Sequence, residues 1–219
     1  MAFQRARTDE QRTERRRQIL DAAAAMLTEM PVSQLSLSAL SRRVCLAKAN
    51  VLRYFDSREA VLLELLEAEL ADWTTELERE APTDGSATER GDQLAELLAS
   101  SLARRHALCD LASAQAAVLE HNISAETAIR HKYAAKQSLE KLVGIATRYL
   151  PEFDDGDAIA FMQTVMLTAI GAWPTSRPPE AILSAFAADP ALAALRVDFT
   201  DTVRRTAEVT ASGILARRK

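Results

Sequence analysis

The chain has 219 residues, of which 48% are hydrophobic and 26% charged, and its formal net charge is -4. This composition supports a buried core and excludes a disordered chain. No apolar run reaches the roughly 20 residues of a membrane span, and the arginine-rich start lacks the apolar segment of a signal peptide. We therefore expect a cytoplasmic protein without a membrane partner, and its two cysteines exclude a disulfide framework.

The charge is divided unevenly along the chain. Residues 1–58 hold 11 basic and 6 acidic residues, a balance of +5, and the remaining residues carry -9. A basic segment joined to an acidic body is the distribution expected when one end binds phosphate. A solvated basic first helix would give the same count, so charge alone leaves both interpretations open.

Alanine and leucine recur at helical spacing and strand patterns are missing, which predicts an all-α fold. The first helix is expected to start near Thr8, where Thr8 and Gln11 have the spacing of a capping box, and to end before Pro31. Ser36 can cap a short second helix, and the chain then turns near Cys45.

A third short helix is predicted from about Ala47 to Arg53, and a long fourth helix follows it. Asp56 and Glu59 have capping-box spacing at the start of this fourth helix, with Ser57 as the alternative cap. The polar, turn-rich segment 82–86 ends it.

Further helices are predicted at about 88–104, 106–121, 124–150, 157–173, 179–188 and 196–217. The helix at 157–173 is apolar around nearly its whole circumference, which indicates burial against its own core on one side and a second subunit on the other. With the helix at 196–217 it would complete an intersubunit four-helix bundle.

The third short helix has the composition of a DNA-recognition helix. Val51 and Leu52 are expected to face the core, which leaves a small, polar and basic face to a groove, formed by Lys48, Ala49, Asn50, Arg53 and Tyr54. Small residues allow close approach to DNA, Asn and Arg pair with base edges, and Lys and Tyr hold phosphates.

Residues 17–66 resemble the DNA-binding domain of the tetracycline-repressor (TetR) family. The segments that carry the resemblance are RQILDAA at 17–23, LSALS at 37–41 and LAKANVLRYFDSREAV at 46–61, and the run from Phe55 to Glu59 is the most diagnostic. The sequence departs from the family at Cys45, where the family usually has Gly, and at Ser41, Ala47 and Leu52. A positive φ at Cys45 would cost on the order of 1 kcal/mol.

The resemblance implies a three-helix, homeodomain-like helix-turn-helix domain at 1–58 and a helical ligand-binding and dimerisation domain at 59–219. It implies phosphate contacts by Ser36, Lys48, Tyr54 and Arg58, base contacts by Ala49, Asn50 and Arg53, and either kind of contact by Arg42 and Arg43. Arg5 and Arg7 would either enter a minor groove or belong to an unstructured basic tail.

The function implied is a homodimeric transcriptional repressor that a small-molecule ligand, largely apolar, releases from a palindromic operator in double-stranded DNA. Candidate residues for the ligand pocket, which ordinary core packing would explain as well, are Leu98, Leu102, Leu111, Gln115, Leu119, Asn122, Tyr133, Met162 and Met166.

Three other functions were weighed. A metal-responsive regulator would use His106 and Cys109, but no carboxylate completes an evident site, and we expect neither metal nor cofactor. The common catalytic motifs are missing, so we expect no enzyme. A helical protein-interaction adaptor would explain the leucine-rich helices but not the basic face of the third helix.

Overall fold

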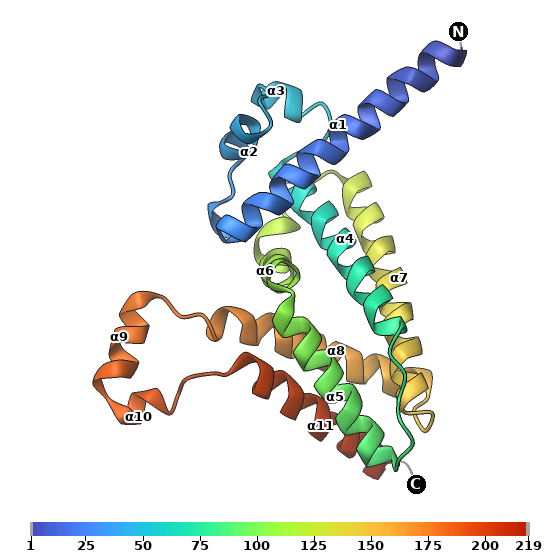
Figure 1. Cartoon of the computed structure of the whole chain (residues 1–219), viewed down its shortest axis with the longest axis vertical. Helices are drawn as coiled ribbons and strands as arrows, with labels where there is room; N and C mark the ends of the chain where they lie inside the picture. Colours follow the sequence, from blue (N-terminus) through green and yellow to red (C-terminus); the bar gives the residue numbers. More distant parts are fainter. Residues whose placement is uncertain (1, 218–219) are drawn as a thin grey trace. The chain divides into compact units, whose positions relative to one another are not determined.

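The computed structural model describes the backbone of residues 2–217 and the side chains of residues 10–217, and over this range it is helical without strands (Figure 1). Its residues form two compact units. The first unit comprises the chain up to Glu69 together with Asp110–Ala134, and the second comprises Leu70–Cys109 together with the chain from Ala135 onward.

The first unit begins with α1 (Ala2–Glu29), which buries Ile19, Ala23 and Met26 at helical spacing. The helix ends just before Pro31, as predicted. Its predicted start was wrong, because the helix already includes Ala2 and Thr8 therefore lies inside it. These buried residues lie on one face of the 28-residue helix, and only this face packs against the rest of the unit.

Three short elements follow: η1 (Val32–Gln34), α2 (Leu37–Arg43) and α3 (Lys48–Val51). The Ser36 hydroxyl accepts a hydrogen bond from the Ala39 amide at 3.1 Å, which confirms the predicted cap of α2. The α-helical part of α3 is shorter than predicted, but turn hydrogen bonds continue it, since the Tyr54 amide donates to the Val51 carbonyl at 2.9 Å.

α4 (Arg58–Glu78) is capped by Ser57, whose hydroxyl accepts from the Ala60 amide at 3.1 Å. The alternative cap is therefore the one used, and the capping box predicted for Asp56 was wrong. Asp56 instead accepts hydrogen bonds from the hydroxyls of Ser124, at 2.5 Å, and Thr127, at 2.8 Å. A local spacing pattern cannot reveal partners that lie this far along the chain.

The partners of Asp56 belong to a segment that completes the first unit. This segment holds the end of α6 (His106–Ala114), a π-helical turn η2 (Gln115–Leu119) and the start of α7 (Ala125–Tyr149). A second hydrogen bond, from the Val32 amide to the Asp110 carboxylate at 2.7 Å, ties the segment to η1. The segment 110–134 is thus held to the short helices by polar contacts at two points.

In the second unit, α5 (Ala87–Arg104), α8 (Asp155–Thr175) and α11 (Phe199–Arg217) pack together. Two capping boxes start α5 and α8, formed by Ser86 with Glu89 and by Asp154 with Asp157. The end of α4 joins this core through Trp73, whose indole nitrogen donates to the Ser101 hydroxyl at 3.0 Å.

α8 is the one described helix whose length and mean hydropathy of 1.2 would suit a membrane span. Its side chains Phe161, Met162 and Val165 are buried within the unit, as in a core helix of a soluble protein. On another face Leu167 is 69% exposed and Ile159 is also exposed. A single chain therefore covers only part of the apolar circumference of α8.

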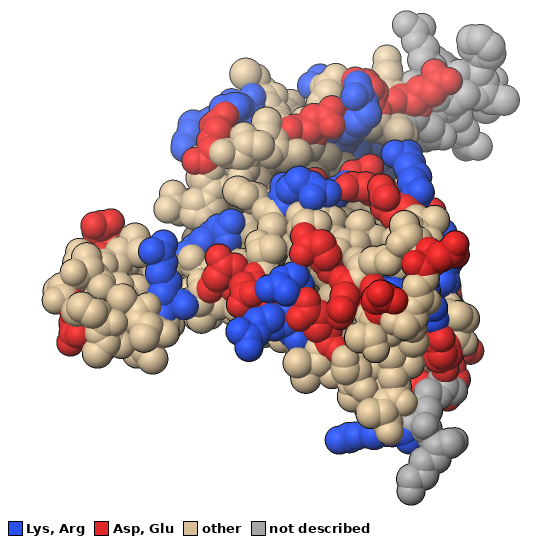
Figure 2. Space-filling view, turned by 60° about the horizontal axis from the view of Figure 1, so that its bottom comes forward, with Lys and Arg blue, Asp and Glu red and all other residues tan. Residues whose placement is uncertain are grey.

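An arm of two helices, α9 (Glu180–Ala188) and α10 (Pro190–Ala193), connects α8 to α11. None of the residues in these two helices is buried, and they include the exposed Ile182 and Leu192. Figure 2 shows the arm, at the left, as a largely uncharged surface. The sequence predicted α9, and α10 was missed because it is a single turn started by Pro190.

Candidate nucleic-acid interface

The short helix α3 is held by one buried side chain and presents polar residues on its other sides. Val51 is fully buried, and α3 packs against α2. Lys48, Ala49 and Asn50 are all exposed. Leu52 was predicted to face the core, and this was wrong: it is 45% exposed, because Val51 alone of the α3 residues is buried and its neighbour lies on a different side of the helix.

An aromatic residue fixes the end of the recognition element, which consists of α3 and the turn that follows it up to Tyr54. Phe55 is buried, and the guanidinium of Arg16 lies 4.0 Å from its ring centroid. Arg16 also donates to the Tyr54 carbonyl, and its Nε donates to the Glu64 carboxylate at 3.1 Å. Arg16 therefore joins α1, the turn after α3, and α4, a role that the sequence gave no means of predicting because its partners are 38 and 48 residues away.

The turn between α2 and α3 has the conformation for which the family resemblance expects glycine. Cys45 has a φ of 53°, in the left-handed region that disfavours side chains with a Cβ. Ser41 and Leu46 keep the turn closed, since the Leu46 amide donates to the Ser41 carbonyl at 3.0 Å. The backbone thus keeps the helix-turn-helix geometry although the residue is not Gly.

The basic residues predicted to contact DNA differ in the partners they have within the chain. Arg43 forms an exposed ion pair with Glu29 at 2.6 Å. Arg42, Lys48 and Arg53 are exposed and have no carboxylate partner among the side chains that the structure describes. Their charges are therefore uncompensated by close contacts within residues 10–217.

Arg58 is half-buried and makes several contacts within the chain. Its side chain is 17% exposed, its Nε and Nη2 donate to the carbonyls of Leu35 and Val32, and Nη1 lies 3.2 Å from Glu59. These bonds connect the start of α4 to the segment before α2. A guanidinium has five N–H donors, and these contacts do not use all of them. Phosphate binding by Arg58 therefore stays a prediction.

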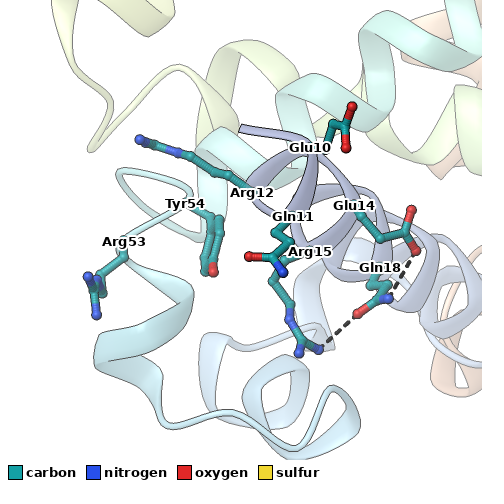
Figure 3. A pocket seen from close by; sticks show the side chains of 8 residues that line it. All are labelled: Glu10, Gln11, Arg12, Glu14, Arg15, Gln18, Arg53 and Tyr54. Atoms are coloured by element: carbon teal, nitrogen blue, oxygen red, sulfur yellow. Dashed lines mark hydrogen bonds between the residues drawn. The ribbon is translucent and has the colours of Figure 1, made fainter. Parts of the chain in front are cut away.

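A groove of about 810 Å³ lies beside the recognition element, between α1 and the turn after α3 (Figure 3). Its lining residues are Glu10, Gln11, Arg12, Glu14, Arg15, Gln18, Arg53 and Tyr54. Arg53 and the half-buried Tyr54 thus belong both to the predicted DNA contacts and to this groove. Ser36, the remaining predicted contact, is exposed at the start of α2.

Two family models match the chain and together cover most of its length. Residues 19–65 match the bacterial regulatory proteins of the tetR family, and residues 67–218 match the tetracyclin repressor-like C-terminal domain. The chain belongs to the TetR family. Its TetR-type helix-turn-helix and helical C-terminal domain confirm the all-α fold predicted from the sequence.

Solved structures of TetR regulators share this fold. A possible TetR family transcriptional regulator from Streptomyces coelicolor A3(2) aligns with a TM-score of 0.63 at 21% identity, covering 93% of this chain and all of that one. A TetR regulator from Rhodococcus sp. RHA1 aligns at 0.57 and 14% identity, covering 94% and 97%. The regulator FadR from Bacillus subtilis, solved in complex with stearoyl-CoA, aligns at 0.51 and 17%, covering 90% and 97%. No curated protein matches the sequence.

The residues predicted to line a ligand pocket in this TetR protein have different environments. Buried members are Leu98, Leu102, Leu111, Leu119 and Met162, while Gln115 and Met166 are half-buried. Asn122 is exposed with a φ of 56°, and Tyr133 is 66% exposed. The nine are divided between the two compact units, and the structure places these last two on the surface of the first unit.

Sequence reasoning missed a buried polar group beside Gln115. His131 is almost fully buried, its Nδ1 lies 3.2 Å from the Glu67 carboxylate, and its Nε2 lies 3.1 Å from the Gln115 amide. The same amide nitrogen donates to Glu120 at 2.7 Å. These neighbours make His131 a hydrogen-bonded residue of the core.

The residues considered for a metal have other partners. The His106 ring packs edge-on against Trp173, with centroids 5.3 Å apart, and the Cys109 thiol donates to the Leu102 carbonyl. Within the described part of the chain, no group of three or more His, Cys, Asp or Glu side chains is placed to hold a metal ion.

Proposed function

We propose that this TetR protein is a homodimeric transcriptional repressor of the cytoplasm, without enzymatic activity, that binds a roughly palindromic operator and releases it when a small-molecule ligand binds. The observation that supports this most directly is the exposed face of α3, where Lys48, Asn50 and Arg53 project from a helix held by the fully buried Val51. TetR regulators are generally non-enzymatic proteins that bind DNA and form dimers.

The contacts proposed on DNA follow from side-chain chemistry. Asn50 and Arg53 pair with base edges in the major groove, and Ala49 lets the helix approach closely. Ser36, Lys48, Tyr54 and Arg58 bind phosphates, and Arg42 and Arg43 contact either bases or phosphates. For Arg43 this requires exchanging its exposed ion pair with Glu29, which costs little because such pairs contribute about 0–1 kcal/mol.

The dimer is proposed to form through α8 and α11. Both helices expose large apolar side chains, with Leu167 of α8 69% exposed and Val209 of α11 72% exposed. Burying such residues against a second copy removes apolar surface from water. The two copies of α3 would then enter successive major grooves, about 34 to 36 Å apart.

Ligand release is proposed to work by a shift between two dimer conformations. A ligand that binds better to a dimer with a different separation of its α3 helices weakens operator binding by that difference in affinity. The ligand is proposed to be largely apolar and to bind within the second unit, beside the candidates Leu98, Leu102, Met162 and Met166. Because the Bacillus subtilis neighbour of the same fold was solved with stearoyl-CoA, long-chain acyl-CoA is the first ligand to test.

Selection from a pool of random DNA duplexes tests the proposal. The wild-type protein is expected to enrich a two-fold symmetric motif, and acyl-CoA or another apolar ligand is expected to lower its affinity for that motif. Failure to enrich any motif would contradict the DNA-binding proposal and favour a protein-interaction adaptor. Turnover of a candidate ligand would show an enzyme instead.

A further inference from the structure

The groove beside α3 brings arginines from two elements together. Arg12 and Arg15 come from α1, and Arg53 comes from the turn that follows α3 (Figure 3). Arg12 and Arg15 are three residues apart on a helix, a spacing that puts both on one face. Only Arg53 was predicted to contact DNA from the sequence, so the groove adds two cations next to the recognition element.

No carboxylate of the described side chains forms an ion pair with the arginines that line the groove. Arg15 donates to the Gln18 amide oxygen at 2.8 Å, and Arg12 and Arg53 have no ion-pair partner among the side chains at 10–217. Their neighbours on α1 differ, since Arg16 pairs with Glu64 and Arg17 with Glu14 and Asp21. Arg12 and Arg15 therefore give up no described ion pair when they bind a phosphate.

Two glutamates also line the groove, and its three arginines outnumber them. Glu14 accepts hydrogen bonds from Arg17 at 2.8 Å and Gln18 at 3.0 Å, and the Arg17 bond holds the pKa of Glu14 below its ordinary value. Arg17, which also pairs with Asp21, therefore offsets part of the negative charge of Glu14. Figure 3 shows Glu10 and Glu14 on one side of the groove, with Arg53 and the guanidinium of Arg12 on the other.

We infer that α1 is a second DNA-contacting element, in which Arg12 and Arg15 bind backbone phosphates of the strand beside the end of α3. This inference rests on the proposed function. The major groove is about 12 Å wide and bounded by two phosphate backbones, so a helix that enters it places its flanks against these backbones. All three arginines line the open groove between α1 and the turn after α3. Phosphate contacts fix the register in which α3 reads bases.

The test measures how the affinity for DNA depends on salt, with the full-length protein. The probes are a duplex enriched by the selection described above and a random-sequence duplex of equal length. Each neutralised phosphate contributes about 0.9 to the slope of log affinity against log salt. The Arg12→Ala/Arg15→Ala variant is expected to lower the slope by about 1.8 on both probes and to keep the base preference.

A matched control separates local contacts from overall charge. Arg79→Ala/Arg196→Ala removes the same charge from two exposed arginines of the second unit and is expected to leave the slope unchanged. Arg12→Lys/Arg15→Lys keeps both charges and is expected to retain most of the slope. Because Arg12 and Arg15 are exposed, thermal unfolding of the alanine variant should match that of the wild type. If the alanine variant is unstable, Arg12→Gln/Arg15→Gln removes the same two charges with side chains longer than alanine, and its salt slope is measured instead.

The outcomes distinguish the inference from the function on which it rests. A wild-type slope in the folded alanine or glutamine variant would overturn the α1 contact and leave the proposed function standing. An equal loss of slope in the Arg79/Arg196 control would also overturn it, because general charge would then explain the effect. A wild-type protein that binds neither probe would overturn both.

Discussion

Several arginines of the second unit connect its helices, whereas several near α3 in the first unit are exposed, and the difference separates folding from binding. In the second unit Arg90 donates to the Tyr149 carbonyl at 2.8 Å, Arg105 contacts Asp72 and Glu76, and Arg204 contacts Glu208. In the first unit Arg12, Arg42 and Arg53 have no carboxylate partner among the described side chains. Arginines of the first kind connect helices, and those of the second kind are available to a polyanion.

The comparison predicts that replacing an arginine of each kind has a different effect. Replacing an arginine that pairs with carboxylates within the chain leaves those carboxylates unpaired and lowers the free energy of unfolding. Replacing an exposed arginine that has no such partner among the described side chains leaves the fold intact and lowers the affinity for DNA. Measuring unfolding and DNA binding on the same variants therefore tests the comparison directly.

The largest effect is expected from breaking the dimer through the second unit. Leu167→Glu puts a charge on the exposed apolar face of α8, so the dimer should dissociate and affinity for the selected operator should fall by about 100-fold or more, towards non-specific binding. Analytical ultracentrifugation and gel shift measure the two effects. Ile129→Glu, at a 59% exposed position of α7 in the first unit, is the control and should remain dimeric. A dimeric Leu167→Glu variant would exclude this face of α8 as the interface.

A smaller effect is expected from replacing Arg53, an exposed arginine in the turn that follows α3. Arg53→Ala should relax sequence preference at one base position, losing about 1–3 kcal/mol of discrimination, because a bidentate base contact is removed. Selection or footprinting with the variant shows whether one position of each half-site becomes degenerate. An unchanged motif would show that Arg53 contacts only phosphate or no DNA.

Arg58 tests a side chain that combines both roles. Its bonds to the carbonyls of Leu35 and Val32 predict that Arg58→Ala lowers the free energy of unfolding by about 1–3 kcal/mol, and its proposed phosphate contact predicts a salt slope lower by about 0.9. Arg105→Ala is the matched variant in the second unit. It should lower stability, because Glu76 loses the hydrogen bond that holds its pKa below the ordinary value, and leave the salt slope unchanged. An Arg58→Ala variant that kept the wild-type slope would assign Arg58 to the fold alone.

Features set by near neighbours in the sequence were predicted well. The cap at Ser36, the end of α1 before Pro31 and the buried Val51 depend on spacings of a few residues, and the structure confirms each of them. The positive φ that Gly would favour was also located at Cys45. Such features are readable because local backbone hydrogen bonds and helical periodicity determine them.

Features set by distant partners were not predictable. Leu52 was assigned to the core with Val51, but the structure buries only Val51 and leaves Leu52 exposed. Arg16 was treated as one of several basic residues, although Glu64, Phe55 and the Tyr54 carbonyl hold it in place. The ligand candidates were chosen for apolar character, which a core residue and a pocket residue share, so hydrophobicity alone cannot separate them.

The smallest effect is expected from Asp56, which ties the recognition helices to the segment 110–134 within the first unit. Hydrogen bonds from Ser124 and then Thr127 hold the pKa of Asp56 below its ordinary value, so the ionised carboxylate is the form that the fold stabilises. A depressed pKa contributes stability at neutral pH that is lost as pH falls below the ordinary aspartate range, about 3.9, and through the lowered value. Asp56→Ala should therefore cost about 1 kcal/mol at pH 7 and progressively less as the pH falls below the ordinary aspartate range. Urea unfolding of both proteins from pH 7 to pH 3 measures this, with Ser124→Ala as the partner in a double-mutant cycle. A cost that stayed constant with pH would show that Asp56 acts through packing rather than through its charge.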